Sequence, residues 1–310
     1  MTEPAETMVS GAAVRIVEVG PRDGLQNEAQ QVATSVKIEL IERLSDCGLR
    51  TIEATSFVSP KWVPQMADAD AVLAGLQRRD GVRYPVLVPN QQGLQRALAA
   101  GVDEIAIFTA ASDAFNRKNI NASIDESLQR LAPVVEAARA QGLAVRAYVS
   151  TVLGCPYQGA VPLTDVVRVV EAVAAMGCYE ISLGDTIGVG TAHQARTMLQ
   201  ACAAAVGMQR LAVHFHDTYG QALANTLACL EAGVRVVDAS VGGLGGCPYA
   251  RGASGNLATE DLLYMLNGLG VDTGVDLPRL VEAARWISEV LGRATASRLG
   301  RIGMNTGACT

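Results

Sequence analysis

Short apolar runs alternate with amphipathic segments along almost the whole chain. Runs rich in β-branched residues and bounded by turn residues are typical of strands, whereas apolar positions three and four apart are typical of helices. The predicted strands are 14–19, 51–55, 84–89, 104–110, 144–150, 180–185, 211–217 and 236–241. The predicted helices are 34–47, 65–79, 91–100, 123–140, 164–176, 191–205, 220–231 and 278–291.

This alternation predicts an α/β fold, because a helix between successive strands makes the strands parallel with right-handed crossovers. Eight such units favour a closed (β/α)8 TIM barrel with extra C-terminal helices over an open doubly wound sheet. We expect residues 1–13 to form a flexible N-terminal tail. No linker divides the remainder, so we expect residues 14–310 to form one barrel domain with a C-terminal helical extension. Several predicted helices end in the glycine that typically follows a helix: Gly48, Gly101, Gly142, Gly177 and Gly233.

A glycine-rich stretch follows the last predicted strand, with six glycines among residues 242–255 and one cysteine, Cys247. So many glycines indicate a loop that needs positive φ angles or close approach to a ligand. The alternative is a plain strand-to-helix turn with a chance cysteine. A helix is predicted next, with Ser254 or Asn256 as its N-cap and acidic residues in its first turn.

Composition excludes several classes of protein. The 310 residues are 49% hydrophobic with a net charge of −6, no basic run and 4% aromatic residues, so we predict no nucleic-acid partner. No apolar stretch reaches the length of a membrane helix, and the first residues lack a signal or transit pattern. The seven cysteines are widely spaced and lack a C-x-x-C motif, which favours reduced thiols in the cytoplasm over disulfides or structural zinc.

In a TIM barrel the active site lies at the C-terminal ends of the strands. Polar residues collect at those predicted ends, although they span most of the sequence. They are Arg22 and Asp23 after the first strand, Glu53 in the second, Asp185 at the end of the sixth, His214 and His216 in the seventh, and Cys247 and Asn256 after the eighth.

His214 and His216 are two residues apart on a strand, so their side chains share one face. Two imidazoles on the inner face of a barrel can bind a metal, or can be polar core residues satisfied by hydrogen bonds. Asp23 can bind the metal through its carboxylate. Alternatively, it forms an Asx turn or a local ion pair with Arg22. Asn256 can bind the metal through its amide oxygen, or it can be the N-cap of the next helix. Two nitrogens and two oxygens suit Mg²⁺ or Mn²⁺ better than structural zinc.

Glu53 interrupts an apolar strand, and a buried carboxylate needs a partner. Arg22 is a candidate partner. Glu53 can orient a ligand or a water, or form a structural ion pair, and the structural role is at least as plausible for Glu18 and Glu180. His193 stands at a predicted helix start and is expected at the surface.

With these residues in view, the chain resembles the hydroxymethylglutaryl-CoA lyase family over about residues 14–292. The loop around Cys247 resembles the lyases more than the related isopropylmalate and homocitrate synthases. The segments that carry the resemblance are 18–28 (EVGPRDGLQNE), 55–66 (TSFVSPKWVPQM), 117–121 (RKNIN), 153–157 (LGCPY), 177–191 (GCYEISLGDTIGVGT), 214–226 (HFHDTYGQALANT) and 240–266.

The resemblance implies a TIM barrel, a divalent cation (Mg²⁺ or Mn²⁺), an acyl-CoA substrate and a homodimer. It implies the metal ligands Asp23, His214, His216 and Asn256. It implies the catalytic residues Arg22, Asp23, Glu53, His214 and Cys247. It implies supporting roles for Glu53 and Asp185, and substrate contacts for Arg22, Asn119, Arg146, Tyr148 and Thr186.

The implied reaction is a metal-assisted retro-Claisen cleavage of (S)-3-hydroxy-3-methylglutaryl-CoA to acetyl-CoA and acetoacetate, as in leucine degradation. Arg22 would face the thioester enolate and Cys247 would protonate its carbon. The base is left open between Asp23 and a metal-associated water near Glu53 or His214.

One position departs from the family pattern. Ala29 stands where family members commonly have lysine after R-D-G-L-Q-N-E, so cleavage of a longer-chain 3-hydroxy-3-alkylglutaryl-CoA is an alternative. Two further alternatives are a Claisen-type acyl-CoA synthase and a CoA-thioester-binding protein on an inactive barrel.

Overall fold

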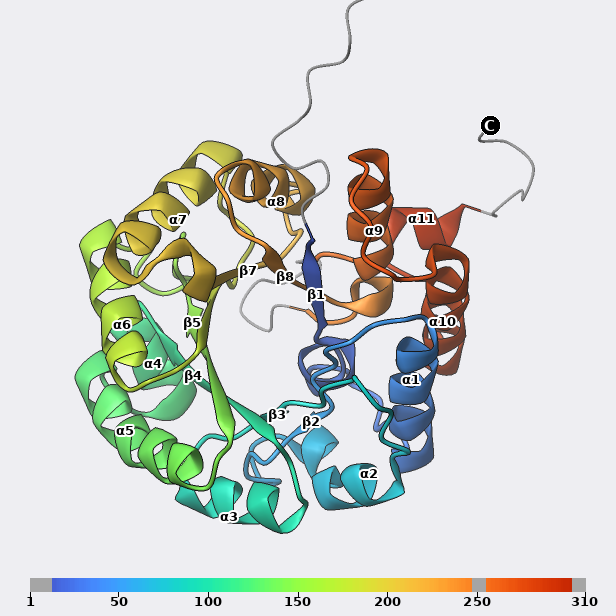
Figure 1. Cartoon of the computed structure of the whole chain (residues 1–310), viewed down its shortest axis with the longest axis horizontal. Helices are drawn as coiled ribbons and strands as arrows, with labels where there is room; N and C mark the ends of the chain where they lie inside the picture. Colours follow the sequence, from blue (N-terminus) through green and yellow to red (C-terminus); the bar gives the residue numbers. More distant parts are fainter. Residues whose placement is uncertain (1–12, 247–254, 303–310) are drawn as a thin grey trace, which may run out of the picture.

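The structure is a computed structural model, and it describes residues 13–246 and 255–302. In these residues eight parallel strands form one sheet with the order β1-β8-β7-β6-β5-β4-β3-β2. Viewed along the barrel, the strands occupy the centre and the helices surround them (Figure 1). The strands are β1 (Arg15–Glu18), β2 (Thr55–Ser56), β3 (Val86–Leu87), β4 (Glu104–Ala110), β5 (Ala144–Ser150), β6 (Glu180–Asp185), β7 (Leu211–Phe215) and β8 (Val236–Ala239).

The sheet closes on itself between β1 and the chain just before β2. The amide of Glu18 donates to the carbonyl of Thr51 at 2.9 Å, and the amide of Glu53 donates to the carbonyl of Glu18 at 2.9 Å. These two bonds form the seam of the barrel. By contrast, β4 and β5 pair along their full length, from Glu104↔Ala144 to Ala110↔Ser150. The predicted (β/α)8 barrel is therefore confirmed, and its closure is much thinner than its opposite wall.

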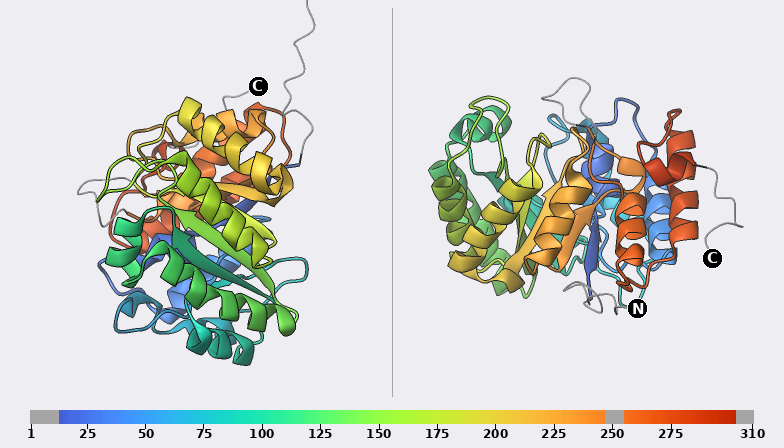
Figure 2. Two further views of the ribbon diagram at one scale, coloured as in Figure 1. Left: turned by 90° about the vertical axis from the view of Figure 1, so that its left-hand side faces the viewer. Right: turned by 90° about the horizontal axis from the view of Figure 1, so that it is seen from above.

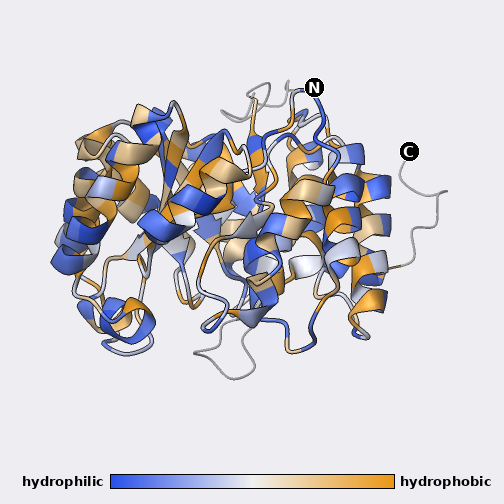
Figure 3. Ribbon diagram, turned by 90° about the horizontal axis from the view of Figure 1, so that it is seen from below, coloured by the Kyte–Doolittle hydropathy of each residue, from blue (hydrophilic) through white to orange (hydrophobic). Residues whose placement is uncertain are grey.

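The helices pack their apolar faces against the strands, so that orange and blue surfaces alternate around the helices in Figure 3. On α6, for example, the residues buried at helical spacing include Val166, Val169, Val170 and Val173. None of the helices in the described ranges is long and apolar enough to cross a bilayer. The α-helices are α1 (Thr34–Asp46), α2 (Ala69–Gly75), α3 (Gln91–Ala99), α4 (Asp113–Ile120), α5 (Ile124–Ala140), α6 (Leu163–Ala175), α7 (Ala192–Val206), α8 (Ala222–Glu231), α9 (Thr259–Gly268), α10 (Leu277–Val290) and α11 (Arg298–Arg301).

The predicted elements match the structure best where the pattern is most regular. Strands 104–110, 144–150 and 180–185 agree residue for residue with β4, β5 and β6. The helix predicted at 65–79 is instead a 3₁₀ turn, η2 (Pro64–Met66), followed by the short α2. Helix α4 was not predicted, because its sequence DAFNRKNI is largely polar and lacks an apolar period.

The predicted cap of α9 is wrong. The helix begins at Thr259 with Ala258 as its N-cap and no side-chain cap. Asn256 lies two residues before the cap and bonds to other partners, and Ser254 lies outside the described residues. The two acidic residues of the first turn, Glu260 and Asp261, are where the sequence predicts them.

Helix α9, which follows β8, and the two extra C-terminal helices α10 and α11 lie together beside α1 on one side of the barrel (Figures 1 and 2). Segments near this extension also bond to loops of the barrel mouth. Arg298 Nη1 lies 3.0 Å from Asp217 Oδ2 in the loop after β7. The amide of Ala296 donates to the carbonyl of Gly242 at 3.0 Å, in the segment after β8. The extension therefore supports two loops that border the site.

Candidate active site

Arg22 and Asp23 lie on a tight π-helical turn, η1 (Gly20–Gly24), directly after β1. The turn packs so closely on its surroundings that its ends need glycine. A Cβ on Gly20 would lie 2.6 Å from Glu18 Oε1, and one on Gly24 would lie 2.7 Å from Leu244 Cβ. Single π-turns are frequent at functional sites. Here the turn directs two neighbouring charged side chains into the barrel mouth.

Arg22 forms the predicted pair with Glu53. Its Nε donates to Glu53 Oε2 at 2.7 Å, its Nη1 donates to Asp23 Oδ1 at 2.6 Å, and its guanidinium lies 5.1 Å from the Tyr148 ring centre. The Tyr148 hydroxyl donates to the same Glu53 oxygen at 3.0 Å. Burial raises the pKa of Glu53, and the charge of Arg22 opposes that rise. Glu53 thus fixes the orientation of two site residues.

The two histidines of β7 lie side by side, as the H-x-H spacing predicts. Their ring centres are 5.4 Å apart. Asp23, His214 and His216 each offer one ligand atom, and these atoms lie within 4.8 Å of one another. In the described ranges, they form the one group of three or more His, Cys, Asp or Glu residues with this geometry.

Asn256 reaches the same cluster because the chain returns alongside β7 after the glycine-rich stretch. The amide of Leu257 donates to the carbonyl of Phe215 at 2.9 Å, which places Asn256 beside the end of the strand. The Asn256 Nδ2 group donates to Asp23 Oδ2 at 2.9 Å and to the carbonyl of Leu244 at 3.1 Å. Its Oδ1 is buried and has no hydrogen-bond partner among the described residues.

These four residues fit a divalent cation. Buried polar atoms normally have partners, yet Asn256 Oδ1 and His216 Nδ1 have none in the described part of the chain. Burial lowers the pKa of His216 to about 4, so its imidazole is neutral. Although burial opposes it, the charge of Arg22 holds the pKa of Asp23 at about 2. A neutral imidazole and an ionised carboxylate are the forms that bind metals.

The sequence prediction missed Asp238, a buried residue of β8. One of its carboxylate oxygens, Oδ2, lies 3.2 Å from His214 Nδ1. Although burial opposes it, the charge of Arg146 holds the pKa of Asp238 well below its usual range. The available signal was an acidic residue inside an apolar strand, the same signal that pointed to Glu53.

The remaining predicted residues lie around this centre in different ways. Asp185 accepts hydrogen bonds from the amides of Gly190 at 2.8 Å and Val189 at 3.2 Å, so it shapes the loop after β6. Thr186 Oγ1 accepts from the amide of Thr151 at 2.9 Å. Asn119 is exposed on α4, the helix that follows β4.

Two predicted residues stand apart from these. Arg146 is completely buried in the barrel, where its guanidinium bonds to Glu180 and Asp238. Cys247 lies outside the described residues, so its catalytic role stays a prediction.

Two buried glutamates hold the root of the glycine-rich stretch, the 3₁₀ turn η4 (Val241–Gly243). Glu18 accepts from the amide of Val241 at 2.9 Å and from the hydroxyl of Thr259 at 2.6 Å. Glu260 accepts from the amide of Gly242 at 2.9 Å. Burial raises the pKa of Glu18 to about 7 and that of Glu260 to about 8.

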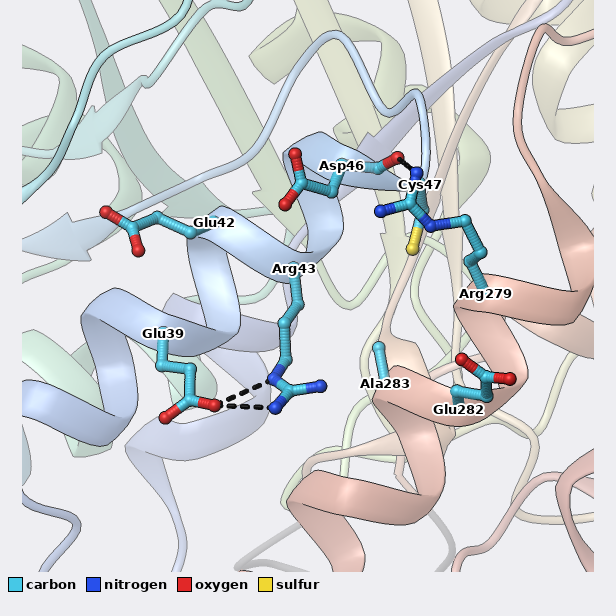
Figure 4. Close-up of a pocket in the computed structure, with 8 residues that line it drawn as sticks. All are labelled: Glu39, Glu42, Arg43, Asp46, Cys47, Arg279, Glu282 and Ala283. Carbon is cyan, nitrogen blue, oxygen red and sulfur yellow. Dashed lines mark hydrogen bonds and ion pairs between the residues drawn. The ribbon is translucent and has the colours of Figure 1, made fainter.

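A hollow of about 310 Å³ lies elsewhere, between α1 and α10 on the outside of the barrel (Figure 4). Its walls carry Glu39, Glu42, Asp46 and Glu282 together with Arg43 and Arg279. None of the predicted site residues within 13–246 and 255–302 lines it. The arrangement of Arg22, Asp23 and the two histidines therefore defines the candidate active site, and this hollow is separate from it.

Comparison with known proteins agrees with this site. The family model described as HMGL-like matches residues 13–287. The mitochondrial hydroxymethylglutaryl-CoA lyase of Bos taurus is 62% identical over 288 residues, which cover 93% of this chain and 89% of the relative. This chain belongs to the hydroxymethylglutaryl-CoA lyase family. The cytoplasmic 3-hydroxy-3-methylglutaryl-CoA lyase of Danio rerio is 60% identical over 94% of this chain and 87% of its own length.

A solved structure of a hydroxymethylglutaryl-CoA lyase family member agrees equally well. The crystal structure of the Pseudomonas aeruginosa enzyme superposes with a TM-score of 0.93 at 56% identity, covering 95% of this chain and 98% of that chain. The family match spans both the polar residues of the mouth and the barrel that positions them.

Proposed function

We propose that this protein is a carbon–carbon lyase that cleaves (S)-3-hydroxy-3-methylglutaryl-CoA to acetyl-CoA and acetoacetate. Membership of the lyase family supports this reaction. The observation that carries it in the structure is the contact between a buried arginine and a candidate metal site. Arg22 Nη1 bonds to Asp23, whose second oxygen faces His214 Nε2 at 4.0 Å.

Asp23, His214, His216 and Asn256 would hold the divalent cation. When bound, the cation supplies positive charge that favours loss of a proton from an adjacent substrate hydroxyl. The nitrogen and oxygen donors suit Mg²⁺ or Mn²⁺. The unpartnered atoms of His216 and Asn256 support this assignment.

Arg22 would stabilise the enolate that leaves when the carbon–carbon bond breaks. Glu53 engages its Nε and Asp23 engages its Nη1, so the guanidinium is held in place before substrate arrives. A preorganised cation in a buried site stabilises developing negative charge without reorganisation during the reaction. The bonds to Glu53 and Asp23 use Nε and Nη1, and we assign Nη2 to the thioester oxygen of the substrate.

The pKa directions narrow the choice of base. A carboxyl group with a pKa of about 2 is a weak base, so Asp23 is better suited to bind metal than to remove a proton. Burial raises the pKa of Glu53, and its Oε1 has no partner among the described residues. We therefore assign proton removal to Glu53 acting through a water. Cys247 remains the proposed proton donor to the enolate carbon.

The decisive experiment is product analysis by mass spectrometry with hydroxymethylglutaryl-CoA, with and without Mg²⁺. We expect acetyl-CoA and acetoacetate in equal amounts, no turnover after chelation, and recovery with Mg²⁺ or Mn²⁺. Full activity in a verified metal-free sample would contradict the metal assignment. Release of CoA from acetyl-CoA and a 2-oxo acid would instead indicate a Claisen-type synthase.

The cell compartment and assembly are further proposals. Five cysteines are free and buried in the described chain, at positions 47, 155, 178, 202 and 229, which is consistent with a reducing cytoplasm. A relative named as cytoplasmic supports the same compartment. We also propose a homodimer, which light scattering of the purified protein will test.

A further inference from the structure

Asp238 and His214 occupy opposite positions on neighbouring strands of the barrel. The register of β7 and β8 pairs His214 with Asp238. Asp238 is 1% exposed, and its Oδ2 lies 3.2 Å from His214 Nδ1. The strand pairing, and not a flexible loop, therefore brings this carboxylate to the imidazole.

The Asp238 carboxylate is itself held from several directions. Arg146 Nη2 donates to Oδ1 at 2.5 Å and Arg146 Nη1 donates to Oδ2 at 3.2 Å. The hydroxyl of Ser182 donates to Oδ2 at 2.6 Å. Arg146 is anchored on its far side, because its Nε donates to Glu180 Oε1 at 2.7 Å. The carboxylate has donors on both oxygens and little freedom to rotate.

This arrangement determines which nitrogen of His214 carries the proton. An ionised carboxylate can only accept hydrogen bonds, so Nδ1 must donate to Asp238. In the neutral ring Nε2 then has a free lone pair, and Nε2 is the atom that faces Asp23. His216 differs, because its buried Nδ1 has no partner in the described chain.

We propose that Asp238 is a positioning residue that fixes the ring orientation and tautomer of His214 for metal binding, with Arg146 and Ser182 donating hydrogen bonds that hold Asp238 in place. The proposal rests on the metal site of the proposed function. Carboxylates that orient metal-binding histidines typically contribute 10- to 100-fold to metal affinity. Arg146 thereby contributes to the site through Asp238, without contacting the ion.

The first test uses the native protein without metal. Nitrogen NMR of ¹⁵N-histidine protein, assigned with a His214→Gln variant, reports which ring nitrogen carries the proton. We expect the Nδ1–H form of His214 in spectra recorded at alkaline pH, where the ring is neutral and one nitrogen carries the proton. An Nε2–H form in the folded native protein overturns the proposal, whatever the variants below do.

The second test compares Mn²⁺ binding by Asp238→Asn and by Glu180→Gln, using electron paramagnetic resonance of free Mn²⁺. Both substitutions remove a buried carboxylate that bonds to Arg146, but only Asp238 contacts His214. We expect the dissociation constant to rise roughly 10- to 100-fold in Asp238→Asn and to stay unchanged in Glu180→Gln.

Two results separate the possible failures. If native protein binds Mn²⁺ and a folded Asp238→Asn variant binds it equally well, the positioning role is wrong while the metal site stands. Equal weakening in both variants also contradicts the proposal, since it indicates a general structural effect. If native protein binds no Mn²⁺, the metal assignment of the proposed function fails first.

Discussion

Buried carboxylates occupy two regions of this molecule and have different partners in each. Inside the barrel, Asp238 bonds to Arg146 and His214. At the root of the glycine-rich stretch, Glu18 and Glu260 bond to backbone amides and to one hydroxyl, and they form no salt bridge with the described residues. All three side chains are 1% exposed or less.

The pKa values therefore differ because of the partners and not because of burial. Arg146 holds the pKa of Asp238 below its usual range against the effect of burial, whereas burial raises the pKa of Glu260 to about 8. The barrel interior keeps charges that can orient ligand groups. At the root of the glycine-rich stretch, burial favours the protonated forms of Glu18 and Glu260, and these side chains bind the backbone amides of Val241 and Gly242. Four substitutions test or sharpen this contrast.

Cys247→Ser should have the largest effect, because Cys247 is the proposed proton donor to the enolate carbon. Cys247 belongs to the glycine-rich stretch whose root is held by Glu18 and Glu260. Serine is a much weaker acid than cysteine, so kcat should fall roughly 10²- to 10⁴-fold, the usual contribution of a positioned acid or base. Mn²⁺ affinity should not change. Steady-state kinetics with hydroxymethylglutaryl-CoA measure this.

The matched control is Cys202→Ser, which alters a buried cysteine of α7. It should lower stability without a comparable loss of kcat. Near-native kcat in a folded Cys247→Ser protein would show that Cys247 does not donate a proton in catalysis. The difference between the barrel interior and the root of the glycine-rich stretch would then affect stability and not catalysis.

Arg22→Gln removes the positive charge that pairs with Glu53. Glu53 then lacks its salt-bridge partner, as Glu18 and Glu260 lack one among the described residues. We expect kcat to fall about 10²- to 10³-fold, as when one preorganised donor is removed. Glu53 loses the charge that opposes the effect of burial, so its pKa should rise further. The variant should therefore lose stability as pH rises above the pKa of an unfolded glutamate.

Arg96→Gln provides the control, since Arg96 pairs with the exposed Asp70. It should change kcat and the pH dependence of thermal unfolding very little. If Arg22→Gln retains kcat within about threefold of native, the donor role assigned to Arg22 is wrong.

Glu260→Gln tests the neutral glutamates. The folded pKa of about 8 lies above the ordinary value of 4.5, so the folded protein binds more protons than the unfolded chain between these values. Native stability should therefore fall as pH rises from about 5 to 8. Glutamine cannot ionise, so the variant should lose less stability over this range, by an amount on the order of a few kcal/mol.

Thermal unfolding at pH 5, 6, 7, 8 and 9 (on the order of one pH unit apart, to resolve the slope) measures this difference. Glu289→Gln, which alters an exposed residue of α10, is a control for the loss of one glutamate. Parallel pH profiles for native and Glu260→Gln proteins would mean that Glu260 is ionised in the fold.

Ala29→Lys should have the smallest effect, because Ala29 is exposed and belongs to neither region. A lysine there should narrow the preference towards the 3-methyl substrate by about two- to fivefold in kcat/KM, since an exposed charge contributes at most about 1 kcal/mol. Gln30→Lys adds the same charge one residue later. Equal selectivity in native and Ala29→Lys proteins for 3-methyl and longer 3-alkyl substrates would exclude a role for Ala29 in specificity.

Most of the barrel could be predicted from local pattern alone. Helices such as α6 repeat their apolar positions with a clear period, and parallel strands buried on both faces, such as β4, are short and largely apolar runs. Strand β3 is only two residues long, although its predicted run extends from 84 to 89, because hydrogen-bond pairing depends on neighbours that a single run does not specify.

Some residues of the site were identified from the sequence, and others were missed. The H-x-H spacing identified His214 and His216 because the strand period places them together. Asn256 was assigned an N-cap as one alternative, and its contact with Asp23 from a distant part of the chain excludes that role. Asp238 was missed, since only the pairing of β7 with β8 shows that it faces His214.

The thin seam between β1 and the chain before β2 has a consequence for amide hydrogen exchange. Local opening favours regions with few cross-strand bonds, and the seam has the bonds at Glu18 and Glu53 while β4 and β5 pair along seven residues each. Glu53 lies on one side of this seam and its partner Arg22 follows β1 on the other. A substrate that engages Arg22 should hold the two sides together, so deuterium uptake at the Glu18 and Glu53 amides should slow on binding while uptake in β4 and β5 stays constant.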